Sequence, residues 1–436
     1  MIITKEFLKN LFFSIMLTIG FKGILDWGYI EFVYPNYGYM GFDLQFNPIK
    51  AVESYSLVLF LGILTFNLFY NLEKPSKIFI YVLFVTLIIP ASSIYFLRDQ
   101  DRYSMYLMVL GYLTLIFTVR FSKIVNITRL KQGTIIAFII VTGITLYVYG
   151  KLVLTGGVGR LNFSITDVYI TRAQYVANQN TLMGYFIIWQ AYVINPLLLA
   201  YSLYKRKKII FTIAFGMQVI LFGMTGFKSF LFAPLVIIAI SYFLNKFGTK
   251  TLLLWILSGS LLLVVISIFI YKLSNSLIFP SIFIRRLFFV PAQLHFQYFD
   301  FFSSHPKLML SHSILASFID YPYPLNPPQL IAYNYYGTVF SANTGYLGDA
   351  YANFGEIGVI IFSIILGTAL AVFDRVSIVL PVELSTSIIL IPSMSLINSA
   401  LFTSFLTHGI LFLIIILYLL SSYQVDLRAN NAVTNE

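Results

Sequence analysis

The sequence contains no cysteine and few charged residues. Without cysteine, the chain of 436 residues can form no disulfide framework, no thiolate metal site and no cysteine nucleophile. Only 10% of its residues are charged, whereas about 25% is usual in a soluble domain. The four histidines, His295, His305, His312 and His408, are scattered without the spacing of metal ligands. These shortages exclude a water-soluble globule, and we expect neither a metal site nor a cofactor.

Apolar and aromatic residues are abundant instead. Hydrophobic residues make up 59% of the chain, which has 43 Phe, 31 Tyr and a mean hydropathy of +0.85. A membrane-spanning helix needs about 20 mostly apolar residues. Twelve segments approach that length, near residues 8–27, 55–72, 78–97, 103–119, 134–153, 183–203, 209–225, 229–244, 251–272, 356–373, 384–402 and 405–422. We therefore predict an all-α polytopic membrane protein in which residues 1–436 form a single transmembrane domain.

Two of the predicted helix pairs are joined by very short breaks. The seventh and eighth segments are separated at Thr225-Gly226-Phe227, and the last two only by polar residues between Thr403 and His408. Residues 1–10 carry lysines and precede an apolar stretch, as in a signal peptide. No A-x-A-like cleavage site follows, so we expect the first helix to be retained.

The net charge of +11 indicates an orientation. If both termini are cytoplasmic, the inside segments carry 16 basic residues against six acidic ones, and the remainder of the chain is nearly neutral. The inside charges are Lys5, Lys9, Lys74, Lys77, Arg120, Lys123, Arg129, Lys131, Lys205, Arg206, Lys207, Lys208, Lys246, Lys250, Arg375 and Arg428, with Glu6, Glu73, Asp374, Glu383, Asp426 and Glu436. This is the positive-inside pattern of a membrane protein, and it leaves no support for a nucleic-acid partner.

Two loops on the predicted outer side are long enough to carry a function. They span residues 155–181 and 273–354, and the second far exceeds an ordinary connection.

Within the second loop, Pro291 suits the first turn of an amphipathic helix over residues 291–303, with Phe296, Phe299 and Phe302 on one face at the bilayer surface. Prolines further on, Pro322, Pro324, Pro327 and Pro328, are expected to break regular structure. The inside segments are too short for a nucleotide-binding domain, and no phosphate-binding G-x-x-x-x-G-K-[S/T] loop is present.

Cationic side chains on the outer side are candidates for binding an anionic substrate. Arg160, Arg172, Arg285 and Arg286 carry guanidinium groups whose planar fork matches phosphate oxygens. The alternative is that they lie at the lipid–water interface or pair with Asp167 and Asp300. Lys228, in the break after the seventh segment, either snorkels to the interface or supplies a second cation beside a phosphate.

The densest group of candidate catalytic residues precedes the tenth segment. Residues 341–356 include Asn343, Asp349, Tyr351, Asn353 and Glu356, together with three glycines. Amides and carboxylates bind sugar hydroxyls, and a carboxylate can accept a proton, so we favour Asp349 as acid or base and Glu356 next. The alternative is a turn followed by a helix cap.

Other polar groups have more ordinary interpretations. Asp99 and Asp101 form an Asp-x-Asp pair between Arg98 and Arg102, for which local salt bridges are favoured over a cation site. Lys22 and Asp26 are four residues apart, which predicts a structural ion pair. His295 is near Arg286 in sequence and is a candidate for lining a substrate cavity.

In these strings the chain resembles the O-antigen polymerases, or oligosaccharide repeat unit polymerases, of bacterial surface-polysaccharide assembly. The resemblance rests on the number of spans, the two enlarged outer loops and three short stretches. These stretches are Thr225-Gly226-Phe227-Lys228-Ser229, Arg285-Arg286 with Pro291-Ala292 and Tyr298-Phe299-Asp300-Phe301-Phe302, and Asn343-Thr344-Gly345 with Gly348-Asp349-Ala350-Tyr351 and Phe354-Gly355.

The resemblance implies a metal-independent GT-C-type glycosyltransferase of the bacterial inner membrane. Such an enzyme moves a growing glycan from polyprenyl pyrophosphate onto the non-reducing end of a new lipid-linked repeat unit at the periplasmic face. Arg160 and Arg172 of the first loop and Arg285 or Arg286 of the second would hold the pyrophosphate. The implied partners are lipid-linked oligosaccharide donor and acceptor, membrane lipid, and a chain-length regulator, flippase and ligase.

Two other functions fit parts of the pattern. O-antigen ligases resemble this architecture but place a histidine before the Gly-x-x-Gly that opens the next span, where this chain has Asn343-Thr344-Gly345 before Gly355-Glu356-Ile357-Gly358. A lipid-linked oligosaccharide flippase would also be basic and polytopic. A transporter usually has charged or broken spans near the midplane, whereas the charges here lie at the predicted outer edge.

Overall fold

A computed structural model describes residues 4–122, 127–164, 167–177 and 179–421. It is 77% helical, and the described residues form no strand. Within these ranges, eleven helices are long and apolar enough to cross a membrane: Lys5–Met40, Pro48–Phe69, Lys77–Leu97, Arg102–Phe121, Gly133–Leu154, Thr181–Tyr204, Lys208–Thr225, Lys228–Phe247, Leu252–Ser274, Tyr346–Val376 and Leu401–Leu420. The prediction of an all-α multi-pass membrane protein is confirmed.

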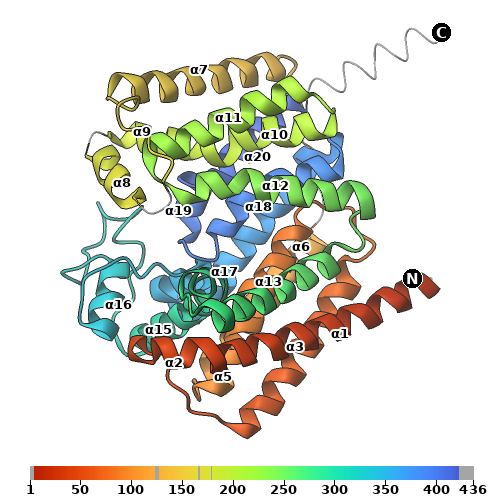
Figure 1. Ribbon diagram of the computed structural model, residues 1–436, viewed down its shortest axis with the longest axis vertical. Coiled ribbons are helices and arrows are strands. Elements are labelled where there is room, and N and C mark those ends of the chain that lie inside the picture. The colour runs from red at the N-terminus through yellow and green to blue at the C-terminus, as the bar shows by residue number, and fades with distance from the viewer. Residues whose placement is uncertain (1–3, 123–126, 165–166, 178, 422–436) are drawn as a thin grey trace.

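The helices are labelled as in Figure 1. In order they are α1 (Lys5–Gly28), α2 (Tyr34–Tyr37), α3 (Pro48–Phe69), α4 (Lys77–Leu83), α5 (Ile89–Leu97), α6 (Arg102–Phe121), α7 (Gly133–Leu154), α8 (Val168–Val176), α9 (Thr181–Trp189), α10 (Asn195–Tyr204), α11 (Lys208–Thr225), α12 (Lys228–Phe247), α13 (Leu252–Ser274), α14 (Ile278–Pro280), α15 (Val290–Ser304), α16 (Pro327–Tyr336), α17 (Tyr346–Val376), α18 (Val382–Ser395), α19 (Leu401–Leu406) and α20 (Ile410–Leu420).

The twelve predicted segments all coincide with helices, but one of them is too short to span. The segment predicted at 384–402 is α18, which ends at Ser395, and the chain turns before α19 begins at Leu401. The polar residues between Thr403 and His408 therefore do not separate two spans. They lie in and just after α19, and a second break follows at Gly409, whose φ is +84°. The predicted break at Gly226 is confirmed, with φ of +69°.

Four helices widen into π-helical turns, each ending two residues before a proline. These turns are Tyr29–Val33, Phe84–Ile88, Gln190–Ile194 and Ser281–Phe289, before Pro35, Pro90, Pro196 and Pro291. Proline has no N–H to donate and its ring clashes with the carbonyl four residues earlier. An extra residue in the preceding turn relieves that clash without ending the helix.

The interior is built around the helix Lys77–Leu97, whose apolar window is wholly buried. Helix α1 packs on α3 and α13, and α17 packs along α6. On the other side, α10, α11 and α12 contact one another, and α12 contacts α18. Helix α7 lies at one edge of the molecule (Figure 1), against α9 and α20. Part of the candidate site lies between α12 and α18.

Segments that the charge pattern assigns to one side of the membrane contact one another. Lys74 donates from Nζ to the carbonyl of Val119 (2.6 Å), and the backbone N–H of Ser76 donates to Asp374 (2.9 Å). At the predicted outer end of α1, Nζ of Lys22 lies 3.5 Å from a carboxylate oxygen of Asp26, which confirms that predicted ion pair. Four of the charges used for the orientation, Lys123, Asp426, Arg428 and Glu436, lie outside the described residues, as does residue 422 at the end of the last predicted span.

The predicted amphipathic helix exists as α15, but its phenylalanines do not lie at the bilayer surface. Phe296, Phe299 and Phe302 are each at most 3% exposed, because α15 packs against α17 and α5 within the bundle. The expectation that the later prolines break regular structure is wrong for two of them. Pro327 and Pro328 begin α16, where proline fits the first helical turn because its missing N–H has no partner there.

Candidate functional site

A polar cavity lies where the second large loop meets α17 and α19. We call this space, about 460 Å³ in volume, the first cavity. Its polar lining comes from α15, two loops, α17 and the α18–α20 turns: Tyr298, His312, Asn326, Ser341, Asn343, Thr344, Asp349, Ser399, Thr403, Thr407 and His408. Hydroxyl, amide, carboxylate and imidazole groups around one cavity suit the recognition of a hydroxyl-rich ligand.

The loop before α17 is held against the α18–α19 turn by close backbone contact. The backbone N–H of Tyr346 donates to the carbonyl of Leu396 (3.0 Å). A Cβ on Gly345 would lie 2.5 Å from the carbonyl oxygen of Ile397, so only glycine permits this approach. This contact brings Asn343 and Thr344 beside Ser399, although they are far apart in sequence.

Helix α17 is two helices joined at a kink. Phe354 and Gly355 have non-helical backbone angles, and Gly355 adopts φ +65° and ψ −142°, a region essentially limited to glycine. The residues before the kink, 346–353, form a short helix that carries Asp349 and Asn353. The part of the sequence expected to be loop is therefore helical, which fixes these side chains on one rigid element.

Asp349 is buried and lines the first cavity, and both of its carboxylate oxygens accept hydrogen bonds. Oδ1 accepts from Nδ2 of Asn353 at 2.9 Å, and Oδ2 accepts from the backbone N–H of Leu401 at 3.1 Å. The carboxylate thus ties the short helix of α17 to the start of α19. Its predicted role as acid or base stays a prediction.

A second cavity of about 410 Å³ continues from the first between α12 and α18. Three residues, Asn343, Ser399 and His408, line both cavities. The remaining walls combine Phe232 and Val236 of α12 and Ile391 and Met394 of α18 with the polar residues Tyr192, Ser229, Ser395 and Asn398. Phe232 is 40% exposed on the side of the bundle. The two cavities therefore share three residues, and the second has a cluster of apolar side chains from α12 and α18 in its wall.

Two of the predicted cations, Arg172 and Lys228, lie near the second cavity, although neither lines it. Arg172 of α8 donates to the carbonyl of Gly226 (3.1 Å), and its guanidinium lies 4.7 Å from the centre of the Phe227 ring. Lys228 begins α12, and its Nζ lies 5.9 Å from the Tyr169 ring, which Arg172 also contacts. The next residue after Lys228, Ser229, lines the second cavity. The break after α11 therefore brings Arg172 and Lys228 together.

The other predicted cations are placed elsewhere. Arg160 donates to the carbonyl of Thr155 and leaves Nε and Nη2 buried without a partner. Arg285 is buried with its guanidinium 4.1 Å from the centre of the Tyr37 ring, and burial lowers the pKa of this arginine. Arg286 is exposed, and neither Arg285 nor Arg286 lines either cavity.

His295 and Tyr351, two further predicted site residues, lie outside both cavities. His295 is fully buried in α15, where Nδ1 lies 2.7 Å from the carbonyl of Pro291 and burial lowers its pKa to about 4. Tyr351 packs on Phe299 and under the Lys307 ammonium.

Asn353 and Glu356 follow on α17. Asn353 accepts from the backbone N–H of Leu310 (2.8 Å). Glu356 accepts a hydrogen bond from Tyr103. Of the string 341–356, only Asn343 and Asp349 among the predicted site residues line the cavities.

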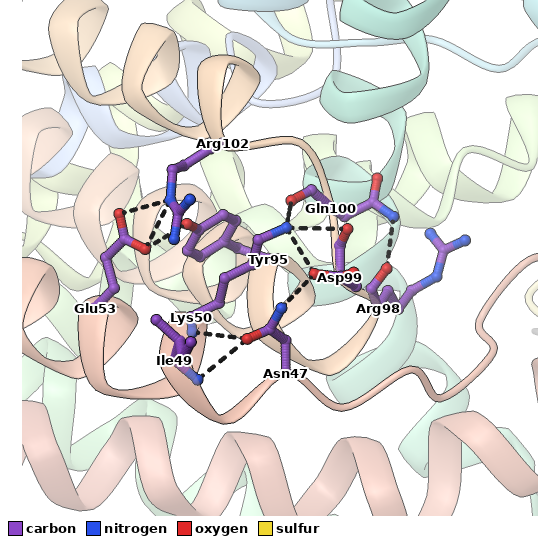
Figure 2. Close-up of polar contacts among 9 residues, drawn as sticks. All are labelled: Asn47, Ile49, Lys50, Glu53, Tyr95, Arg98, Asp99, Gln100 and Arg102. Carbon is purple, nitrogen blue, oxygen red and sulfur yellow. Dashed lines mark hydrogen bonds and ion pairs between the residues drawn. The ribbon is translucent and has the colours of Figure 1, made fainter.

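The Asp-x-Asp segment takes part in a polar network with neighbouring segments (Figure 2). Asp99 pairs with Lys50 at 2.7 Å and accepts from Asn47, and Arg102 pairs with Glu53. These partners come from the start of α3, not from the turn itself as the sequence suggested. Asp101 caps α6 by accepting from the backbone N–H of Ser104 (2.8 Å). No group of three or more potential metal ligands occurs among the described residues.

Sequence reasoning missed the contribution of the last helices to the site. Ser399, Thr403, Thr407 and His408 line the first cavity, yet the sequence placed Ser399 within a predicted span and the other three in a polar break. His312 also lines it from within the large loop. The available signal was the set of polar residues recurring through an apolar stretch, which is unusual for a lipid-facing helix.

Fold and site together define a multi-pass, all-helical membrane protein with two cavities that share three lining residues. Comparison of the chain with protein-family models, with curated proteins and with solved structures finds no match.

Proposed function

We propose that this protein polymerises lipid-linked oligosaccharide repeat units of a bacterial surface polysaccharide. It transfers the growing glycan from a polyprenyl pyrophosphate to the non-reducing-end sugar of a new lipid-linked repeat unit. The reaction takes place at the periplasmic face of the inner membrane, in a metal-independent GT-C-type glycosyltransferase with both termini in the cytoplasm.

The observation that carries the proposal is the pair of cavities that meet at Asn343, Ser399 and His408. A lipid-linked glycan is an apolar chain joined through pyrophosphate to a polar sugar. The second cavity, whose wall includes Phe232 and Val236 of α12 and Ile391 and Met394 of α18, suits the end of the polyprenyl chain. The first cavity, with its amides and hydroxyls, suits sugars.

Cationic side chains near the residues that the two cavities share support the same arrangement. Arg172 and Lys228 both contact the Tyr169 ring, and Lys228 directly precedes Ser229, which lines the second cavity. Negative charge grows on the pyrophosphate as its bond to the sugar breaks, and fixed cations aimed at that charge lower the barrier. The glycosyl–pyrophosphate bond is already activated, so the transfer needs no nucleotide.

A ligase is the second candidate, because histidines do line the cavity. The sequence argument against a ligase was the lack of a histidine next to Asn343. His312 and His408 reach the same cavity from other segments, which weakens that argument. A ligase would use the same donor but pass the finished glycan to a lipid A-core acceptor.

The test is the surface glycolipid profile of a strain lacking this gene, with and without complementation. For a polymerase, the mutant shows lipid A-core that carries a single repeat unit. The ladder of longer glycan chains on the gel returns on complementation. Finished polymer stranded on its carrier would indicate the ligase, and single units trapped on the cytoplasmic leaflet would indicate a flippase.

A cavity-filling variant connects that profile to the site. Ser399 lies at the junction of the cavities, so Ser399→Trp should abolish the ladder by occupying the space for the pyrophosphate-linked sugar. Ile139→Trp is the matched control, because Ile139 is 63% exposed on α7, away from both cavities. A full ladder from a stably inserted Ser399→Trp protein would remove these cavities as the site.

A further inference from the structure

His408 occupies a fixed corner between the two cavities. Its backbone N–H donates to the carbonyl of Thr403 (3.1 Å), and the next residue, Gly409, has φ +84°. A Cβ on Gly409 would lie 2.9 Å from the side chain of Val193. The chain at this corner therefore has little freedom to move.

Aromatic contacts from the helix Thr181–Tyr204 hold the same corner. Nε1 of Trp189 donates to the carbonyl of Leu406 (2.7 Å), and the ring of Tyr192 lies 5.9 Å from the imidazole of His408 in a stacked arrangement. The Tyr192 hydroxyl in turn donates to Ser229 (3.1 Å). The imidazole is thus oriented by packing, as a catalytic group must be.

Among the described residues, Nδ1 of the His408 imidazole is left available for a ligand. Nδ1 of His408 is buried without a partner in the described part of the chain, and the ring lines both cavities. Asp349, the carboxylate at the same cavity, accepts hydrogen bonds at both of its oxygens. Of the three residues at the junction, Asn343 and Ser399 are poor proton acceptors at neutral pH. His408 is the junction residue with basic character.

We infer that His408 is the catalytic base of the proposed transfer and contacts the acceptor hydroxyl, while Asp349 positions the helix that faces it. This inference rests on the proposed function. The acceptor oxygen bonds to the anomeric carbon of the donor as the bond from that carbon to the pyrophosphate breaks. The hydroxyl proton passes to the unprotonated ring nitrogen of His408, and the bonding electron pair stays on the pyrophosphate beside Arg172 and Lys228.

Several titratable and charged groups face His408 from the surrounding elements. They are Tyr192, Tyr298, His312 and Asp349 at the cavity walls, with Lys228 and Arg172 behind Ser229 and Phe227. The imidazole of His312 lines the first cavity but not the second, so it lies away from the three residues that the cavities share. A pH dependence that belongs to His408 must therefore be separated from one that belongs to His312 by testing both.

The experiment uses the full-length protein in liposomes and lipid-linked repeat units extracted from the host strain that lacks this gene. Turnover is measured against pH for the wild type, His408→Gln, His312→Gln and His305→Gln. A reaction that needs one neutral imidazole slows tenfold per pH unit below its pKa. His305 is the matched control, because its ring stacks on Phe301 at 4.0 Å and lines neither cavity.

We expect His408→Gln to lower kcat by about 100-fold or more, the usual contribution of a general base, with little change in KM. The residual activity should lose the fall in rate toward acid pH, which His305→Gln should retain. Imidazole added to His408→Ala should restore part of the turnover, which a purely structural role would not allow.

Other outcomes overturn the assignment. Wild-type kcat in His408→Gln would do so, as would residual activity that keeps the acid-side fall or that loses it in His312→Gln instead. If His408→Gln does not accumulate, the test is the rescue of His408→Ala by imidazole. An absence of rescue, in a His408→Ala protein whose thermal unfolding midpoint equals that of the wild type, would reject His408 as the base. Failure of the wild type itself to make polymer would reject the proposed function, which is distinguishable from loss confined to one variant.

Discussion

The side-chain amide of Asn353 donates a hydrogen bond of 2.9 Å to Oδ1 of Asp349, one helical turn earlier in the short helix before the α17 kink. The opposite oxygen of Asp349 accepts from the backbone N–H of Leu401. The spanning helix Tyr346–Val376 is thereby joined to the start of the spanning helix Leu401–Leu420. This contact lies at one wall of the first cavity, which Asp349 lines.

Asp349→Asn should destabilise the protein even though the two side chains have the same shape. An amide has a single oxygen, so it cannot accept both hydrogen bonds, and one N–H would face another N–H in a buried position. An unsatisfied buried donor costs about 1–3 kcal/mol. We expect a lower midpoint of thermal unfolding in detergent.

The matched control for this variant is Asp320→Asn, an exposed carboxylate in the large loop. Surface changes of that kind usually stay within about 0.5 kcal/mol. Equal melting of Asp349→Asn and the wild type would show that the carboxylate does not join α17 to α19.

Gly355→Ala tests the kink that separates the short helix from the spanning part of α17. At φ +65° and ψ −142°, an alanine is strained by about 1–3 kcal/mol, although the nearest side-chain atom to a Cβ, on Lys307, is 3.5 Å away and leaves room. We expect lower stability and lower polymer yield.

Gly143→Ala provides the contrast within a regular helix. Gly143 lies in α7 with nothing within 4 Å of an added Cβ, so alanine should be neutral or stabilise by up to about 1 kcal/mol. If both substitutions had the same effect on melting, the loss at Gly355 could not be assigned to backbone strain.

Much of the fold was predictable because it depends on local properties of the chain. Long apolar runs predicted the helices, and the Thr225-Gly226-Phe227 break appears where glycine and threonine interrupt one. The π-helical turns were not predicted, although each precedes a proline. The end of α18 at Ser395 was missed because Leu396 and Ile397 are as apolar as any spanning residue.

The candidate site was predictable only in part, because it depends on contacts between distant segments. Asn343 and Asp349 were identified from one polar string, and both line the first cavity. His408 was not, since only the contact of Gly345 with the α18–α19 turn brings it near them. The buried face of α15 was misread for a similar reason, because its amphipathic pattern does not reveal that α17 covers the aromatic side.

Asp101 is expected to act as a helix cap and not as a metal ligand. Its Oδ2 accepts from the backbone N–H and the hydroxyl of Ser104, at 2.8 and 3.0 Å. Asp101→Ala should cost about 1 kcal/mol of stability, whereas Asp101→Asn should cost little because asparagine caps equally well. Thermal unfolding of the two variants distinguishes these results.

Chelation completes the test of the Asp-x-Asp segment. Asp99 is paired with Lys50, which lowers the pKa of the Asp99 carboxyl through their hydrogen bond. With both carboxylates engaged, transfer activity should persist in excess EDTA. Activity that is lost and then restored by Mg²⁺ or Mn²⁺ would instead assign a cation site to this turn.

Arg172→Ala should shorten or abolish the glycan chains while the protein still accumulates in the membrane. The guanidinium of Arg172 bonds to the carbonyl of Gly226 and covers the Phe227 ring, beside the wall of the second cavity. A hydrogen bond to a charged group contributes about 1.5–3 kcal/mol, so we expect roughly a 10- to 100-fold loss of turnover. Arg172→Lys should recover part of it, because lysine keeps the charge but not the planar fork.

Two further arginine variants make that result specific. Arg206→Ala, an exposed change on the predicted inside surface, should leave the ladder intact and controls for loss of positive charge alone.

Arg286→Ala tests the sequence-based assignment of a pyrophosphate contact to a residue that lines neither cavity. Neither arginine lines a cavity, but Arg172 shares the Tyr169 ring with Lys228 at the start of α12, so loss confined to Arg172→Ala would locate the pyrophosphate between α8 and α12. Equal loss in both would extend the substrate path to the π-helical turn before α15, and full-length chains from Arg172→Ala would reject its role as a pyrophosphate clamp.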